Sequence, residues 1–219
     1  MSNAFRLVYL HGFASSPASK KAQFFRRRFA EKGLEMAVPN LAADGFENLT
    51  ISGQLSVVER TVEGWPALLV GSSLGGYLAA LYAARHLEVR GIVLLAPAFD
   101  FARRWGEWLG HERVEAWKKS GFLRLYHYGE VREAEVSYRL LEDALCYEPY
   151  PRLTQPALVL HGLRDDVVPV EASECFVGAQ RGATLYKLDS GHELLDVLDL
   201  LWNKTWAFVE GLGGESAGR

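Results

Sequence analysis

Short, mostly apolar runs alternate with amphipathic stretches over most of the chain, and this alternation restricts the fold more than any other feature. Apolar runs of this length are typical of strands covered on both faces, and we expect strands at residues 5–10, 34–38, 66–70, 89–96, 156–160 and 184–188. Helical patterns lie between them, at residues 17–32, 52–63, 77–86 and 193–209. Such an order favours a parallel sheet with helices on both faces.

One stretch interrupts the alternation. Between residues 99 and 149 no buried strand is evident, and the amphipathic pieces are rich in tryptophan and tyrosine. An insertion of about 50 residues between two core strands predicts a small helical cap. We expect one domain over residues 5–210, with a cloning scar at residues 1–4 and a flexible tail at residues 211–219.

Residues 71–75 read Gly-Ser-Ser-Leu-Gly and match the pattern G-x-S-x-G, between an expected strand and an expected helix. A turn this sharp leaves no room for bulky residues two positions either side of the serine. It holds Ser73 at a strained backbone angle and points a helix N-terminus at the site. The pattern predicts Ser73 as a nucleophile. The alternatives are a Gly-rich turn without chemistry, or Ser72, for which a local backbone hydrogen bond is expected.

A serine hydroxyl needs a base, usually histidine, and a carboxylate to orient that base. In strand–turn–helix sites of this kind the chain order is serine, acid, histidine. Asp165 or Asp166 follows the strand at 156–160, and His192 follows the strand at 184–188. Ligands bind beyond the carboxyl ends of parallel strands, where these residues are expected. The order predicts His192 as the general base and one of the two aspartates as the acid.

Other residues compete for these roles. Asp189 is a weaker candidate for the acid. His11 and His161 are alternative bases, although each precedes a glycine at a strand end, where local hydrogen bonding is the better interpretation. A metal site made from three histidines and an aspartate is not expected, because no short ligand spacing supports it; the set is His11, His161, His192 and Asp165.

A serine hydrolase also needs two N–H groups that hold the oxyanion. We expect one from Leu74, which follows the nucleophile, and one from Phe13 in the loop after the first strand. Gly12 permits a close approach of that loop, and the ring of Phe13 is expected to line the substrate site. Trp105 and Trp108 of the cap are further candidate substrate contacts, although the cap tryptophans fit equally well as a small core of the cap itself.

The charge balance, 24 Lys+Arg against 27 Asp+Glu, gives no electrostatic case for a nucleic acid or an anionic membrane as partner. No apolar run is long enough to insert into a membrane, and the start of the chain lacks the pattern of a signal peptide. We therefore expect a cytoplasmic protein whose two cysteines, Cys146 and Cys175, are reduced and buried. No cofactor or metal is expected, and the oligomeric state stays open.

Taken together, these motifs resemble the α/β-hydrolase superfamily over residues 9–208. The segment Tyr-Leu-His-Gly-Phe-Ala-Ser-Ser-Pro at residues 9–17 resembles small bacterial esterases of the YqiA type. The cap and the stretch Leu-Glu-Asp-Ala at residues 141–144 are similar to the mitochondrial thioesterase branch that removes acyl groups from proteins. In this superfamily the spacing to Val168-Pro169 favours Asp165 over Asp166 as the acid.

The resemblance implies an α/β-hydrolase fold and hydrolysis of esters or thioesters without a cofactor. The oxyanion segment departs from the His-Gly-Gly-Gly pattern of many lipases, which argues against a large triglyceride substrate. We therefore expect a serine hydrolase that acts on small-molecule or acyl-group esters and thioesters through an acyl-enzyme. The alternatives are acyl transfer or C–C bond hydrolysis by the same residues, or a catalytically inactive binding protein with this fold.

Overall fold

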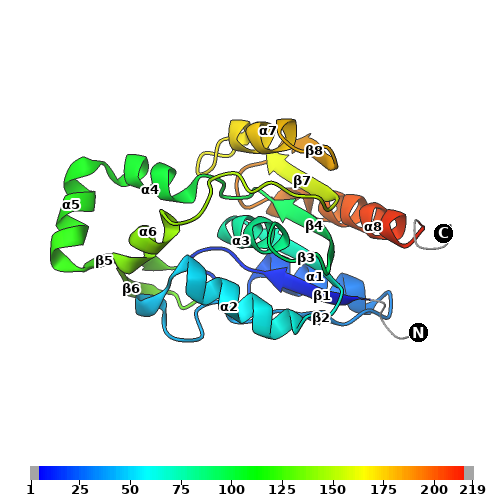
Figure 1. Cartoon of the computed structure of the whole chain (residues 1–219), viewed down its shortest axis with the longest axis horizontal. Helices are drawn as coiled ribbons and strands as arrows, with labels where there is room; N and C mark the ends of the chain where they lie inside the picture. Colours follow the sequence, from blue (N-terminus) through cyan, green and yellow to red (C-terminus); the bar gives the residue numbers. More distant parts are fainter. Residues whose placement is uncertain (1–4, 215–219) are drawn as a thin grey trace.

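A computed structural model of the chain describes residues 5–214. Its centre is a six-stranded sheet, parallel throughout, with the order β2-β1-β3-β4-β7-β8 (Figure 1). The strands are β1 (Arg6–Leu10), β2 (Met36–Ala37), β3 (Ala67–Ser72), β4 (Val89–Leu95), β7 (Ala157–Gly162) and β8 (Ala183–Leu188). Each strand falls on one of the apolar runs, so the α/β prediction with a mostly parallel sheet is confirmed.

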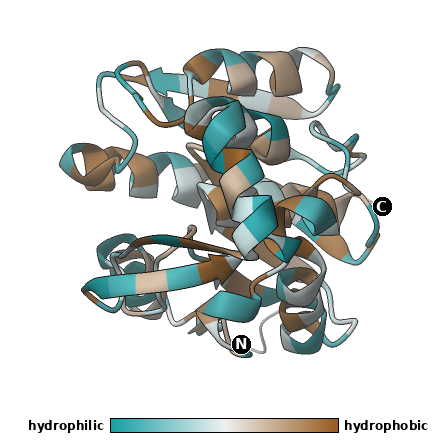
Figure 2. Cartoon of the chain, turned by 90° about the vertical axis from the view of Figure 1, so that its left-hand side faces the viewer, coloured by the Kyte–Doolittle hydropathy of each residue, from teal (hydrophilic) through white to brown (hydrophobic). Residues whose placement is uncertain are grey.

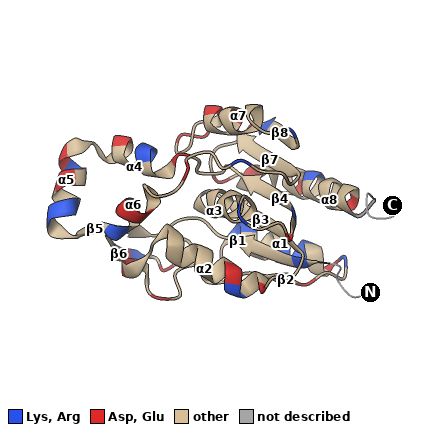
Figure 3. Cartoon of the chain, in the orientation of Figure 1, with Lys and Arg blue, Asp and Glu red and all other residues tan. Residues whose placement is uncertain are grey.

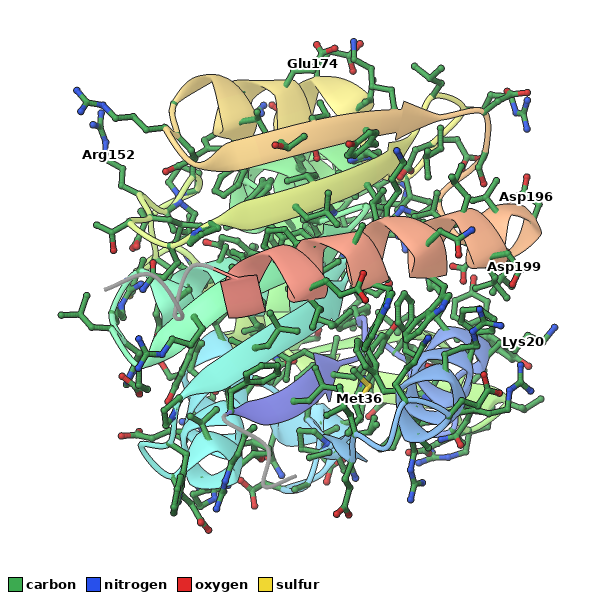
Figure 4. The ribbon with its side chains drawn as sticks, turned by 90° about the vertical axis from the view of Figure 1, so that its right-hand side faces the viewer. Lys20, Met36, Arg152, Glu174, Asp196 and Asp199 are labelled. Atoms are coloured by element: carbon green, nitrogen blue, oxygen red, sulfur yellow. The ribbon has the colours of Figure 1, made fainter. Side chains whose placement is uncertain are left out.

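Two helical layers cover the sheet, because side chains of a strand point alternately to opposite faces. In β1, Val8 and Leu10 join the core on one face, and Leu7 and Tyr9 join the core on the other. The first face is covered by α2 (Ile51–Val62), α3 (Leu74–Ala83) and α7 (Val170–Gly178). The second face is covered by α1 (Lys20–Ala30) and α8 (Leu198–Gly214), which Figure 4 shows lying across the strands, with Asp199 in its first turn.

Helix α3 lies at the centre of the molecule, because every one of its residues is buried. A helix that is apolar on all sides is stable only inside a protein. It packs on β1, β3 and β4 of the sheet and on helix α2. The turn that leads into α3 is therefore held by the most buried part of the fold.

The cap follows β4 and lies beyond the carboxyl ends of the strands, at the left of Figure 1. It contains α4 (Phe101–Leu109), α5 (His111–Ser120), β5 (Phe122–His127), β6 (Arg132–Ser137) and α6 (Arg139–Ala144). The three helices agree with the prediction of a small helical cap, but strands β5 and β6, which pair antiparallel, were not predicted.

The hairpin escaped prediction because only one of its faces is covered. Ala134 and Val136 are buried, whereas Glu133 and Glu135 are exposed, and the indole N–H of Trp117 donates to the Val136 carbonyl at 3.0 Å. Over segments this short, alternating polar and apolar residues are compatible with either an amphipathic helix or a strand. Packing against α5 stabilises the strand conformation here.

Several helices differ from the prediction, and α3, for example, spans residues 74–83 instead of 77–86. Helix α1 begins at Lys20, not at Pro17, because a turn precedes it in which the Ser19 N–H donates to the Ser16 carbonyl. Helix α7 was not predicted at all. Residues 211–214 belong to α8, so the predicted flexible tail is wrong for these four residues. The interpretation of residues 1–4 as a cloning scar falls outside the described residues.

The predicted stop of α1 is confirmed. Gly33 takes a positive φ of 74°, and the N–H groups of Leu34 and Gly33 return to the carbonyls of Phe29 and Ala30. This is the Schellman arrangement, which favours glycine because a side chain would strain the left-handed backbone.

The surface carries both signs of charge on the cap and on the layers around the sheet (Figure 3). Among residues 5–214, no helix combines the length and the apolar character that a membrane crossing requires. Cys146 and Cys175 are free and exposed, which corrects the prediction of buried thiols.

Candidate active site

The turn between β3 and α3 has the strained geometry expected of a nucleophile position. Ser73 has a positive φ of 54°, which non-glycine residues rarely adopt. A Cβ on Gly71 would lie 2.2 Å from the Gly75 carbonyl oxygen, and one on Gly75 would lie 2.1 Å from the Leu10 carbonyl oxygen. Both glycines are therefore required by backbone contacts, as the pattern at residues 71–75 predicted.

Three loops at the carboxyl ends of β3, β7 and β8 bring a serine, an aspartate and a histidine together. His192 Nε2 lies 3.1 Å from Ser73 Oγ, and His192 Nδ1 lies 2.8 Å from Asp165 Oδ2. The carboxylate is fully buried, and 12% of the His192 side chain is exposed. The imidazole thus bridges a hydroxyl and a carboxylate that are 92 positions apart in the sequence (165 − 73).

Asp165 is surrounded by N–H donors on both of its oxygens. Oδ1 accepts from the backbone N–H groups of Val167 and Val168, at 2.9 and 2.8 Å. Oδ2 accepts from His192 and lies 3.0 Å from Nε2 of His161. Burial by itself raises the pKa of the Asp165 carboxyl, but the hydrogen bonds from His161, His192 and Val168 outweigh it and hold that pKa well below its usual range. The carboxylate is ionised at neutral pH.

The rival residues lie elsewhere. Asp166 is exposed, and Asp189 pairs with Arg164 at the surface. His11 is buried, and its Nδ1 makes the expected local contact, 3.0 Å from the Gly12 carbonyl oxygen. Its Nε2 accepts from the N–H of Leu41, a residue distant in sequence, which was not predicted. Burial lowers the pKa of His11 and favours the neutral ring.

His161 does more than the sequence indicated. It is fully buried, and its Nδ1 lies 2.7 Å from Ser173 Oγ on α7. Its Nε2 lies 2.8 Å from the Val168 carbonyl oxygen as well as close to Asp165. The expected local hydrogen bond is present, but the contact with the acid was missed. His161 and Asp165 are four positions apart, and that spacing was the available signal.

The two segments that carry the predicted oxyanion donors both lie next to Ser73. A Cβ on Gly12 would lie 3.3 Å from Ser73 Cβ and 3.9 Å from Ser73 Oγ, so the loop after β1 passes directly beside the serine. Leu74 is the first residue of α3, and its N–H has no partner within the helix. Among residues 5–214, no hydrogen bond uses the N–H of Phe13 or of Leu74. Both groups are available for an anion.

The two cap tryptophans proposed as substrate contacts differ. Trp105 lies against Phe13, with ring centroids 4.8 Å apart, and also packs on Trp117 in the interior of the cap. Trp108 is 67% exposed, and the guanidinium of Arg113 lies over its ring. Trp105 therefore connects the predicted substrate site to the cap core, whereas Trp108 lies on the surface of the cap, away from this aromatic cluster.

A metal-binding arrangement is not formed at this site. In the part of the chain that the structure describes, residues 5–214, no group of three or more histidine, cysteine, aspartate or glutamate side chains is placed to hold a metal ion. The nitrogens of His11 and His161 have protein partners, as described above.

The sheet order, the strained serine turn and the cap after β4 define an α/β-hydrolase fold. The chain belongs to the Uncharacterised protein family UPF0227, which matches residues 6–209. Two solved structures show the same fold. Alpha/beta hydrolase domain-containing protein 10 from mouse has a TM-score of 0.79 at 20% identity, with 94% of this chain and 90% of that chain covered. Ferulic-acid-bound Est1E from Butyrivibrio proteoclasticus has a TM-score of 0.82 at 20% identity, with 96% and 90% covered.

Two curated relatives are named as thioesterases. Palmitoyl-protein thioesterase ABHD10, mitochondrial, from Mus musculus is 33% identical over 135 residues, which cover 54% of this chain and 41% of that protein. The Bos taurus protein of the same name is 30% identical over 156 residues, with 67% and 50% covered. The chain spans about half the length of these relatives or less. The resemblance to α/β-hydrolases and to the thioesterase branch is confirmed, and a cytoplasmic location stays a prediction.

Proposed function

We propose that this protein is a serine hydrolase that cleaves carboxylic esters or thioesters through an acyl-enzyme on Ser73. The observation that carries the proposal is the pair of contacts made by His192, at 3.1 Å to Ser73 Oγ and 2.8 Å to Asp165 Oδ2. With its Nδ1 proton donated to the buried carboxylate, the imidazole has Nε2 free to accept the proton of the serine. A binding protein has no need of this arrangement.

The proposed reaction has two halves. Ser73 Oγ attacks the acyl carbonyl while its proton moves to His192 Nε2, and the N–H groups of Phe13 and Leu74 stabilise the oxyanion. The tetrahedral intermediate expels the alcohol or thiol, which takes the proton from His192. Water then attacks the acyl-serine, gives a proton to His192, and releases the acid as that proton returns to Ser73. Asp165 stabilises the imidazolium in both halves.

The substrate class follows from the neighbours of Ser73 and from the relatives. The ring of Phe13, which follows Gly12 in the loop next to Ser73, packs on the indole of Trp105, and these two apolar side chains would suit an acyl group. The curated relatives are named as thioesterases that act on palmitoyl proteins, and we extend acyl thioesters to this chain as candidate substrates. Thiolates and the alkoxides of activated esters are both good leaving groups. The same stabilisation of the oxyanion should therefore suffice for thioesters and for activated esters.

A fluorophosphonate probe tests the nucleophile directly. The folded protein should form one adduct, located on Ser73 by peptide mass spectrometry, and Ser73→Ala should abolish it without changing the melting temperature by more than a few degrees. The matched control is Ser72→Ala, which should keep the adduct. Lack of any adduct on the folded wild-type protein would end the serine-hydrolase proposal.

Turnover of p-nitrophenyl esters and acyl thioesters of graded chain length then measures the preferred acyl group. Product analysis in the presence of added alcohols or thiols separates hydrolysis from acyl transfer. Free acid as the main product supports hydrolysis, whereas a new ester or thioester as the main product would reassign the protein as an acyltransferase that uses the same residues.

A further inference from the structure

The loop that carries the Phe13 N–H touches the cap at its turn, not only at its aromatic rings. We call residues 11–16 the oxyanion loop, and strands β5 and β6 with residues 128–131 the cap hairpin. Gly129, in the turn of the cap hairpin, donates its N–H to the Ala14 carbonyl at 3.1 Å. Two segments more than a hundred residues apart therefore meet one residue away from a proposed oxyanion donor.

The fit at this contact leaves no space for a side chain. A Cβ on Gly129 would lie 2.9 Å from the Ser15 carbonyl carbon and 3.0 Å from the Ser16 nitrogen. These are backbone atoms, which cannot rotate away as a flexible side chain can. Any larger residue at position 129 must push the turn of the cap hairpin and the oxyanion loop apart.

The oxyanion loop has a conformation that needs external support. Ala14 has a positive φ of 50°, a region that favours glycine. Its carbonyl, directed by that backbone angle, is the acceptor for Gly129. On the other side of Phe13, the Gly12 carbonyl is held by His11 Nδ1 at 3.0 Å, and the N–H of a trans peptide points opposite to the preceding carbonyl. The Phe13 N–H is thus fixed by anchors on both sides.

A second path joins the same turn to Phe13. The Val131 N–H donates to the His127 carbonyl at 2.8 Å, and the Glu130 N–H donates to His127 Nδ1 at 3.0 Å, so His127 closes the turn. The buried His127 ring packs edge-on against Phe46 with centroids 4.6 Å apart, and Phe46 packs against Phe13 at 5.2 Å. Figure 2 shows this cap end of the molecule, where hydrophobic and hydrophilic residues are mixed along the elements.

We infer that the turn of the cap hairpin is a positioning element of the oxyanion site, with Gly129 as its positioning residue. The inference rests on the proposed function and extends it. The cap holds the loop that presents the Phe13 N–H to the developing oxyanion. The rate of the chemical step then depends on a cap residue that touches neither Ser73 nor the substrate.

Gly129→Ala tests the inference, with Gly106→Ala as the matched control. Gly106 lies on cap helix α4, and a Cβ there meets nothing within 4 Å. We expect Gly129→Ala to lower kcat for a p-nitrophenyl ester by about tenfold or more, below the roughly 10²–10³-fold cost of removing a donor outright, with KM within about twofold. Gly106→Ala should leave both constants within about twofold.

Phe46→Leu provides a second variant that keeps the region apolar. It weakens the contact between His127 and Phe13, and it should also lower kcat at nearly constant KM. Hydrogen exchange measured by mass spectrometry gives a readout that does not need activity. Amides of the oxyanion loop should exchange faster in both variants, while amides of β3 and α3 should be unchanged.

The outcomes separate this inference from the proposed function. If the wild-type protein turns over no ester and forms no adduct, the proposed function fails, and the exchange data alone test whether the cap hairpin holds the loop. Unchanged exchange in both variants overturns the inference. Faster exchange with unchanged kcat in an active enzyme overturns it as well, because loss of the support that the cap hairpin gives the loop would then have no effect on catalysis.

Discussion

Replacing Asp165 by asparagine exchanges one carboxylate oxygen for an NH₂ group where every polar neighbour donates a hydrogen bond. Oδ1 faces two backbone N–H groups at 2.8 to 2.9 Å, and these groups cannot change their protonation. Oδ2 faces His192 and His161, whose rings can move a proton from one nitrogen to the other. The asparagine nitrogen is therefore expected at the Oδ2 position.

The consequence is a change of tautomer at His192. To accept from the new NH₂ group, Nδ1 must lose its proton, and Nε2 then carries it. An Nε2–H group cannot take the proton of Ser73, so the base is lost although the geometry is nearly unchanged. A wrong tautomer of this kind costs about 10⁴ in kcat in serine proteases, or roughly 5.5 kcal/mol at 1.36 kcal/mol per factor of ten.

Stability should fall as well. Asp165 loses charge-assisted hydrogen bonds in a fully buried position, and each such bond contributes about 1.5–3 kcal/mol. Some of this loss is offset because the neutral amide is cheaper to bury. We expect a net decrease in the free energy of unfolding of about 1–3 kcal/mol.

The assay is steady-state hydrolysis of a short p-nitrophenyl ester between pH 6 and 9, with urea unfolding of the same samples. Asp166→Asn is the matched control, since its side chain is exposed and adjacent in sequence. It should leave kcat within about twofold and the free energy of unfolding within about 0.5 kcal/mol. Retention of more than a tenth of wild-type activity by Asp165→Asn would refute the reasoning, and a severe loss in Asp166→Asn would reassign the acid.

Three further expectations concern stability and the substrate surface. Gly75→Ala should prevent folding or lower the melting temperature by more than 10 °C in a thermal scan, because its Cβ would overlap a backbone oxygen; a wild-type melting curve would contradict the assigned turn. Trp105→Ala should cost about 3 kcal/mol in urea unfolding and raise KM for apolar acyl groups, whereas Trp108→Ala, at an exposed position, should cost less than about 0.5 kcal/mol; equal effects would remove the distinction between them. The pKa of Asp165 is lowered by folding, so the contribution of this carboxylate to stability is complete above the unfolded pKa of about 3.9 and is lost as pH falls below it. In Asp165→Asn the free energy of unfolding should therefore decline less steeply between about pH 5 and 2 than in the wild-type protein. An unchanged slope would contradict the assigned hydrogen bonds.

Much of the fold was predictable because burial on both faces leaves a strong local mark. The run Leu-Leu-Val at residues 68–70 and the run Val-Leu-Leu at 93–95 are fully buried in β3 and β4, and no neighbouring segment has to be known to predict them. The hairpin of the cap is the opposite case. Its strands are half exposed, and their structure depends on Trp117 from α5 and on the contact with the oxyanion loop.

The site residues divide in the same way. Ser73, Asp165 and His192 could be proposed from order and spacing, because a loop after a parallel strand always ends at the same edge of the sheet. The partners of these residues were not predictable. His161 contacts Asp165 only because the loop at residues 162–168 folds back over the strand end, and Ser173 reaches His161 only because α7 packs there.

By itself, the sequence determined the strands of the central sheet, the glycines around Ser73 and the chain order of the serine, the aspartate and the histidine, because these depend on local sterics and on the direction of parallel strands. Only the tertiary structure decided which N–H groups surround the carboxylate, which cap tryptophan packs against Phe13, and that Gly129 contacts the oxyanion loop. Those contacts join segments far apart in the chain. Their distances are set by the packing of whole elements, which no local pattern of residues encodes.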